Sequence, residues 1–283
     1  MSSPRDAHTA TLRPDGRVVL VGGFAGEGQR PLSSIDVYDP GSDTMGLAAS
    51  LATVRGGHAA ALTGDGRVLV IGGWTGPRSY TATTEIFDPD AGTVAAGPDL
   101  PAGADALDAV ALADGRVLVT GGHVRSAVAT DLAAIFDPAT DAWTVVSSLQ
   151  TARFKHTGVL LHDGSVLIMG GTTDDETLLA STEIFDPATG RFGPGPELAE
   201  PRYKMPGGAV VVADGRVVIG GGGRSVEVMD LASGTSRVIG SFDARGSFAT
   251  LNRLGSGNLL VIGGYDDRIG LRRESRLVSA SEV

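Results

Sequence analysis

The sequence predicts an all-β protein of propeller type, built from a repeated four-stranded unit. Three observations support this prediction. A short apolar run that stops on two glycines, such as RVLVIGG at residues 67–73, occurs six times in the 283 residues. The copies follow one another at intervals of roughly 50 residues, which is typical of repeat proteins. No copy shows the apolar spacing of a helix, so each repeat is expected to form one small β-sheet.

The second repeat contains the complete unit. Four strands are expected in it, at residues 57–62, 68–71, 84–87 and around Val94. Asp65-Gly66 suits a tight hairpin between the first two strands, and Pro89 ends the third strand because proline cannot donate to a ladder. The second strand, residues 68–71, is apolar throughout, which predicts burial on both of its faces. Gly72 and Gly73 are expected where a side chain would collide with a neighbouring backbone or require a disfavoured φ.

The same signals recur along the chain and predict one domain, residues 1–283, with six blades. The predicted blades span residues 5–50, 51–99, 100–149, 150–199, 200–241 and 242–283. The last blade shows no fourth strand after its third, at roughly Ser275 to Val283. Either Met1 to Arg5 supply that strand or the blade has three strands. We favour the second solution, because a five-residue segment containing Pro4 makes a poor strand.

The repeats resemble those of kelch-repeat proteins. The motifs that carry the resemblance are the Gly-Gly strand end, the aromatic-Asp-Pro turn as in Phe87-Asp88-Pro89, the Arg-x-x-His start of the first strand as in Arg55 to His58, and Trp143. The resemblance covers residues 5–283 and implies a six-bladed kelch-type β-propeller. Kelch propellers include actin-binding modules, substrate adaptors, sialic-acid epimerases and a copper oxidase, so the resemblance alone implies no single function.

Composition excludes several classes of function. Lys and Arg number 23 against 33 Asp and Glu, a net charge of −10, which argues against nucleic acid as a partner. Without cysteine there is no disulfide, no thiolate nucleophile and no cysteine-ligated metal. No apolar run approaches the roughly 20 residues that span a bilayer, and the first residues do not resemble a leader. We therefore expect a soluble, cytoplasmic monomer without membrane contact, cofactor or metal.

In kelch-like propellers the start of each first strand faces the mouth of the central channel. Basic side chains recur there, and we expect them to bind ligand: Arg5, Arg55, Arg153, Arg202, Lys204 and Arg245. Converging cations repel one another unless an anion joins them, and arginine matches carboxylate and phosphate. The predicted function is therefore the binding of a small anionic molecule or an acidic peptide in a basic central funnel. In the alternative interpretation, Arg-x-x-His braces the Gly-Gly turn or the neighbouring blade.

The residues that follow the glycine pairs differ among the copies and are candidates for specificity. Trp74 and His123 are expected to contact ligand. Trp74 and Tyr80 would form an aromatic wall for a flat ligand, or Trp74 would cap a blade junction. Residues 174–176, Asp-Asp-Glu, are interpreted as a solvated acidic loop, because they lack the ligand spacing of a cation site.

Two further functions stay open. In an enzyme of this sequence, His58 or His156 would act as the base and Asp105 or Asp108 as the acid or orienting group, the two aspartates replacing the Arg and His of the third copy. The chain lacks serine-hydrolase, phosphate-loop and zinc-protease motifs, so the expected class is a metal-free isomerase, lyase or cyclase. The other alternative is a protein-interaction scaffold.

Overall fold

The structure is a computed structural model that describes residues 1–77, 79–124, 128–279 and 281–283. It comprises two compact units, an N-terminal unit, Met1–Val146, and a C-terminal unit, Ser147–Val283. All regular structure in the described residues is β. Within this part of the chain no helix is long and apolar enough to cross a membrane.

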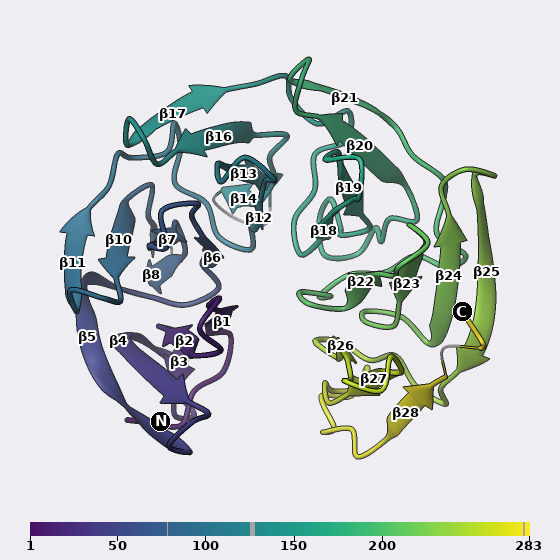
Figure 1. The fold of residues 1–283 in the computed structure, drawn as a ribbon, viewed down its shortest axis with the longest axis horizontal. Helices are drawn as coiled ribbons and strands as arrows, with labels where there is room; N and C mark the ends of the chain where they lie inside the picture. Colours follow the sequence, from purple (N-terminus) through teal and green to yellow (C-terminus); the bar gives the residue numbers. More distant parts are fainter. Residues whose placement is uncertain (78, 125–127, 280) are drawn as a thin grey trace. The chain divides into compact units, whose positions relative to one another are not determined.

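The N-terminal unit contains three antiparallel sheets that follow one another in chain order (Figure 1). The first sheet consists of β1 (Thr9–Leu12), β2 (Val18–Val21), β4 (Arg30–Asp39), β3 (Phe24–Ala25) and β5 (Thr44–Arg55). The second consists of β6 (Ala59–Leu62), β7 (Val68–Ile71), β10 (Thr84–Asp88) and β11 (Thr93–Ala96). The third consists of β12 (Asp108–Ala111), β13 (Val117–Thr120), β16 (Ala133–Asp137) and β17 (Ala142–Val145). The first strands β1, β6 and β12 are spatial neighbours.

The C-terminal unit also contains three sheets. Its first sheet consists of β18 (Thr157–Leu160), β19 (Val166–Met169), β20 (Thr182–Asp186) and β21 (Arg191–Pro194). The second consists of β22 (Ala209–Val211), β23 (Val217–Ile219), β24 (Ser225–Asp230) and β25 (Thr235–Ser241). The last consists of β26 (Thr250–Arg253), β27 (Leu259–Ile262) and β28 (Ser275–Val278). Three strands are thus described in the last sheet, and residues 1–5 belong to no strand.

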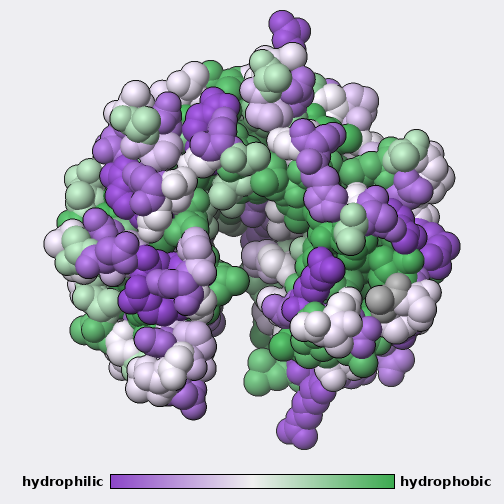
Figure 2. All heavy atoms as spheres, in the orientation of Figure 1, coloured by the Kyte–Doolittle hydropathy of each residue, from purple (hydrophilic) through white to green (hydrophobic). Residues whose placement is uncertain are grey.

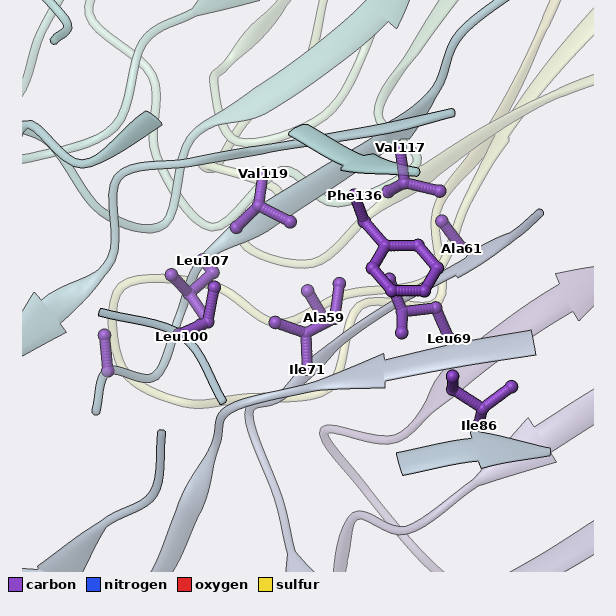
Figure 3. Close-up of a cluster of buried hydrophobic side chains, with 11 residues drawn as sticks. Ala59, Ala61, Leu69, Ile71, Ile86, Leu100, Leu107, Val117, Val119 and Phe136 are labelled. Carbon is purple, nitrogen blue, oxygen red and sulfur yellow. The ribbon is translucent and has the colours of Figure 1, made fainter. Parts of the chain in front are cut away.

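The core of each unit lies between adjacent sheets. In β7 all four side chains are buried, as the apolar run predicts. Val68 and Val70 pack toward the first sheet, whereas Leu69 and Ile71 pack toward the third (Figure 3). Because strand side chains alternate between faces, a strand enclosed by two sheets has no polar position. On the surface, hydrophilic and hydrophobic residues are interspersed (Figure 2).

The backbone geometry explains why two glycines follow β7, as predicted. Gly72 and Gly73 have φ angles of 61° and 106°, in the region that side chains rarely adopt. A β-carbon on Gly72 would lie 2.5 Å from the carbonyl oxygen of Ala104, which belongs to the next sheet. A glycine at this position therefore allows neighbouring sheets to approach closely.

Two features were not expected from the sequence. The first sheet has five strands rather than four, because β3 adds to its edge. Two segments for which no strand was expected also form small ribbons, β8 (Trp74–Gly76) with β9 (Ser79–Tyr80), and β14 (His123–Val124) with β15 (Val128–Ala129). The ribbons hold the residues that follow the glycine pairs in defined positions.

Candidate functional site

Arg55 is the last residue of β5 and has no exposed surface, and its side chain reaches the second sheet. Its guanidinium donates to the carbonyl oxygens of Gly72 (2.7 Å) and Thr83 (2.9 Å) and to the Glu85 carboxylate (2.8 Å). These bonds tie the end of β7 to the start of β10. The glycine turn leaves carbonyl groups that must be paired once buried, and the guanidinium pairs with two of them. Arg55 therefore braces the turn.

The other sheets with an arginine at this position repeat the arrangement. Each guanidinium reaches the carbonyl oxygen of the first glycine of its pair and a carboxylate on the third strand. The carboxylate partners are Asp36 for Arg5 (2.7 Å), Glu183 for Arg153 (2.9 Å) and Glu227 for Arg202 (2.6 Å). All four arginine side chains have no exposed surface. A ligand in solvent has no access to these groups, so we leave them out of the binding site proposed below.

In the third and sixth sheets the residues at the Arg-x-x-His positions differ by one from those expected from the sequence. Isolated bridges pair the residue after the arginine position with the residue after the glycine pair, as in Gly56 with Trp74 and Asp105 with His123. The arginine position of the third sheet is therefore Ala104, one residue before Asp105. The same comparison gives Leu107 rather than Asp108 at its histidine position.

The sixth sheet differs by one residue in the same way. Ser247 pairs with Tyr265, so Gly246 occupies the arginine position and Ala249 the histidine position. Arg245 thus precedes the arginine position, and Phe248 is not in the place of a histidine. The Arg245 guanidinium donates to the carbonyl oxygen of Gly222 (3.0 Å) and lies 3.3 Å from the Asp267 carboxylate.

The third sheet lacks both partners of the buried ion pair. Ala104 replaces the arginine and Ala134, on β16, replaces the carboxylate that Glu85 supplies on β10; both alanines are fully buried. Removing one partner alone would leave an uncompensated buried charge, whereas removing both does not. The sequence signal is the change from TEIF at residues 84–87 to AAIF at residues 133–136.

His58 and His156 are buried, with 5% and 3% of their surface exposed. Burial lowers the pKa of His58 to about 3, and the charge of Arg55 adds to this shift. Burial and then Arg153 lower the pKa of His156 to about 3 in the same way. Nε2 of His58 lies 3.0 Å from the Thr9 hydroxyl of the preceding sheet. Neutral histidines of such low basicity are poorly suited to the role of general base expected for them.

Asp105 and His123 are brought together, and Tyr80 joins them. His123 Nδ1 lies 2.7 Å from Asp105 Oδ1, and His123 Nε2 lies 3.3 Å from the Tyr80 hydroxyl. The phenol and imidazole rings meet edge to face at 5.0 Å. Asp108 lies nearby in sequence, opposite Thr120 at the start of the β12–β13 pair. We call Tyr80, Asp105 and His123 the His123 cluster.

Trp74 lies at the junction of the first two sheets. Its indole meets the Phe24 ring edge to face at 5.4 Å. The Phe24 ring covers Gly56, where a β-carbon would lie 2.4 Å from a ring carbon. Trp74 also stands opposite Tyr80 in the β8–β9 ribbon, so both side chains lie on one face of it. This geometry fits the junction cap, and it also places the indole beside Tyr80.

The second residue after each arginine position has a positive φ and connects neighbouring sheets. In the N-terminal unit these residues are Ala7, Gly57 and Ala106, with φ between 45° and 62°. The amide of Gly57 donates to Ala7 (3.1 Å), and the amide of Ala106 donates to Gly57 (2.8 Å). In the C-terminal unit the residues are Lys155, Lys204 and Phe248, with φ of 56°, 53° and 59°.

Lys204 lies among aromatic rings. Its ammonium is 4.8 Å from the centre of the Tyr203 ring and 5.3 Å from that of Tyr265. The Arg245 guanidinium lies 5.7 Å from Tyr203, and the Phe248 and Tyr265 rings are 5.7 Å apart. We call these five residues the Lys204 cluster.

In the described part of the chain, the positive charge of Lys204 has no carboxylate partner. Burial acts to lower the pKa of Lys204, but its contacts with Tyr265 and Tyr203 outweigh burial and raise it. The ammonium is therefore charged at neutral pH. Among the residues that the structure describes, no carboxylate lies within 4.0 Å of it, whereas Lys155 pairs with Asp175. Sequence reasoning missed Lys155, although its place two residues after Arg153 was a usable signal.

These features define a class of protein. Repeated antiparallel sheets, glycine-ended second strands and cores between adjacent sheets are those of a β-propeller. The family model of the Kelch motif matches residues 7–44 and 55–101. The chain therefore contains Kelch motifs, and its repeats support a kelch-repeat protein. A comparison with curated proteins found no match.

Proposed function

We propose that this kelch-repeat protein binds a small anionic molecule or an acidic peptide at the Lys204 cluster. The observation that carries the proposal is the ammonium of Lys204, which is charged and lacks a carboxylate partner among the described residues. A half-buried cation without a counter-ion is costly, and an anionic ligand would relieve this cost.

The surroundings of Lys204 favour a ligand with an acidic group and a flat or apolar part. Arg245 supplies a second cation close to the same Tyr203 ring, and Phe248 is 38% exposed beside Tyr265. Guanidinium groups bind carboxylate and phosphate in a planar geometry, and aromatic rings bind flat groups. Among the residues first expected to bind ligand, Lys204 and Arg245 are the ones in this cluster.

The test is calorimetric titration with inorganic phosphate, citrate and hexaglutamate at low salt. We expect binding of at least one probe, with Lys204→Gln weakening it roughly 10- to 100-fold, since a charged hydrogen bond contributes about 1.5–3 kcal/mol. The matched control is Arg253→Gln, which removes a cation from an exposed position of β26. Equal losses in both variants, or no binding by any probe, would reject the proposal.

We also propose that the six sheets form one six-bladed propeller over residues 1–283 and that the protein is a cytoplasmic monomer. The support is the regular repeat spacing and the absence of cysteine from the sequence. The enzyme alternative no longer rests on His58 and His156. It is favoured by one observation, the contact of Asp105 with His123.

A further inference from the structure

The His123 cluster is built from three segments of the N-terminal unit. Asp105 precedes β12, His123 begins β14 and Tyr80 ends β9. The amide of His123 donates to the Asp105 carbonyl oxygen (2.9 Å), and the amide of Asp105 donates back (3.3 Å). This backbone pairing places the carboxylate and the imidazole side by side. The β8–β9 ribbon holds Tyr80 opposite Trp74, which brings the phenol to the other edge of the imidazole.

The contacts assign a role to each imidazole nitrogen. The Asp105 carboxylate lies 2.7 Å from Nδ1 without the geometry of a hydrogen bond, and its negative charge favours the tautomer that carries the proton on Nδ1. Nε2 is then the basic nitrogen, and it faces the Tyr80 hydroxyl. Burial and then the charge of Asp105 raise the pKa of Tyr80, so this hydroxyl keeps its proton at neutral pH. The chain phenol, imidazole, carboxylate can thus move a proton from Tyr80 toward His123.

The cluster is less deeply buried than His58 and His156. The side chains of His123 and Asp105 keep 12% and 14% of their surface exposed, and Tyr80 is also partly exposed. Trp74 offers an apolar ring on the same face of the ribbon as Tyr80. A base held by an orienting carboxylate, with a hydroxyl at the reacting end, is the general arrangement for proton transfer.

We propose that Tyr80, His123 and Asp105 form an acid–base site for a small hydroxycarbonyl or keto-acid compound. The Tyr80 oxygen accepts the proton of a carbon next to the carbonyl group while its own proton passes to Nε2 of His123. The C–H bonding pair remains as an enolate, and the Asp105 carboxylate stabilises the imidazolium. Return of the proton by the same route restores the starting compound or gives its isomer, so no co-reactant is consumed. This site is independent of the anion-binding proposal.

The test is deuterium exchange. Pyruvate, dihydroxyacetone and glyceraldehyde are incubated with the full chain in D2O, and loss of the proton next to the carbonyl is followed by NMR. We expect exchange at least tenfold faster than in buffer for one compound, and a loss of at least tenfold in Tyr80→Phe and His123→Gln. Asp105→Asn tests a positioning role, and we expect it to change the pH profile of exchange as well as the rate.

Controls separate this proposal from other causes. Tyr38→Phe removes the hydroxyl of an aromatic residue elsewhere in the same unit, and it is expected to exchange like the parent protein. Arg253→Gln, at an exposed position of β26, should also leave exchange unchanged. Exchange and anion binding are measured in separate experiments, so failure of one proposal is distinguished from failure of the other. Nitrogen NMR should show the proton of His123 on Nδ1. Exchange no faster than in buffer for all three compounds, or a proton on Nε2, would overturn the proposal.

Discussion

The backbone amide of Lys204 donates a hydrogen bond of 2.8 Å to the carbonyl oxygen of Lys155, and both residues have positive φ angles. The bond connects the starts of the first strands in two adjacent sheets. Ala7, Gly57 and Ala106 form the same connection in the N-terminal unit, with almost no side chain. All six copies have a positive φ at this position, whereas a lysine stands there only in two copies of the C-terminal unit.

Replacing Lys204 by glycine should separate stability from binding. A non-glycine residue at positive φ lowers the free energy of unfolding by about 1–2 kcal/mol, so replacing it by glycine relieves this strain. Glycine also makes the unfolded chain more flexible, which offsets about 0.4–1 kcal/mol of the relief. We expect Lys204→Gly to be as stable as the parent protein or more stable by up to about 1 kcal/mol, measured by urea unfolding. The same variant should lose the binding of phosphate, citrate or hexaglutamate.

Ala106→Gly is the matched control for this prediction. Ala106 has a φ of 50° at the equivalent position and carries no charge. It should change stability by a similar amount and leave anion binding unaltered. Destabilisation of Lys204→Gly by more than about 1 kcal/mol would show that the lysine stabilises the fold.

Arg55→Ala should strongly destabilise the protein. The variant leaves the Glu85 carboxylate and two backbone carbonyl groups without their buried partner. Loss of one member of a buried ion pair costs about 3–5 kcal/mol. Arg67→Ala removes a partly exposed arginine that pairs with Asp65 and Asp141, and it should cost about 1 kcal/mol or less. Urea unfolding at pH 7 compares the two, and similar losses would contradict the assigned bracing role.

Strand order in the repeats could be predicted because each signal has a local physical cause. The apolar run Val68 to Ile71, Gly72 and Pro89 each constrain the backbone at their own position. The last sheet was expected to have three strands because the sequence shows no fourth strand beyond the third, at roughly Ser275 to Val283, and three strands are described there. The ribbon that pairs Trp74 with Tyr80 was missed because its polar sequence carries no alternation of apolar residues.

The site was harder to predict because it depends on register. Counting along Arg-x-x-His aligned Asp105 with an arginine, whereas the backbone bridge to His123 shows that Asp105 is one residue further on. The sequence left the arginines open as ligand groups or as braces of the Gly-Gly turn, since a motif does not show whether its charge already has a partner. Glu85 and Glu183 lie about 30 residues away from the arginines that they neutralise. Lys204 was among the cations expected from the sequence to bind ligand, and its aromatic surroundings come from three separate segments.

Mild acid should destabilise the protein through its buried histidines. In the unfolded chain His58 and His156 bind protons below about pH 6.5, whereas in the folded protein their pKa is about 3. The folded pKa is depressed, so the full stability is present above pH 6.5 and is lost as pH falls toward 3. In this range each histidine lowers the free energy of unfolding by about 1.4 kcal/mol for each unit that the pH falls, which amounts to roughly 2 kcal/mol at pH 5. Most carboxylates stay ionised there, so histidine dominates the window.

Urea unfolding at pH 7, 6 and 5 measures this effect. His58→Gln should reduce the loss of unfolding free energy between pH 7 and 5 by roughly 2 kcal/mol, because one depressed group is removed. His162→Gln is the control, since it replaces an exposed histidine in the same way. The quantity compared is the change in unfolding free energy between pH 7 and pH 5 within each variant, so any packing defect of the glutamine variant cancels. A pH dependence that is unchanged in His58→Gln would mean that His58 is protonated in the folded protein, against the burial that the structure gives it.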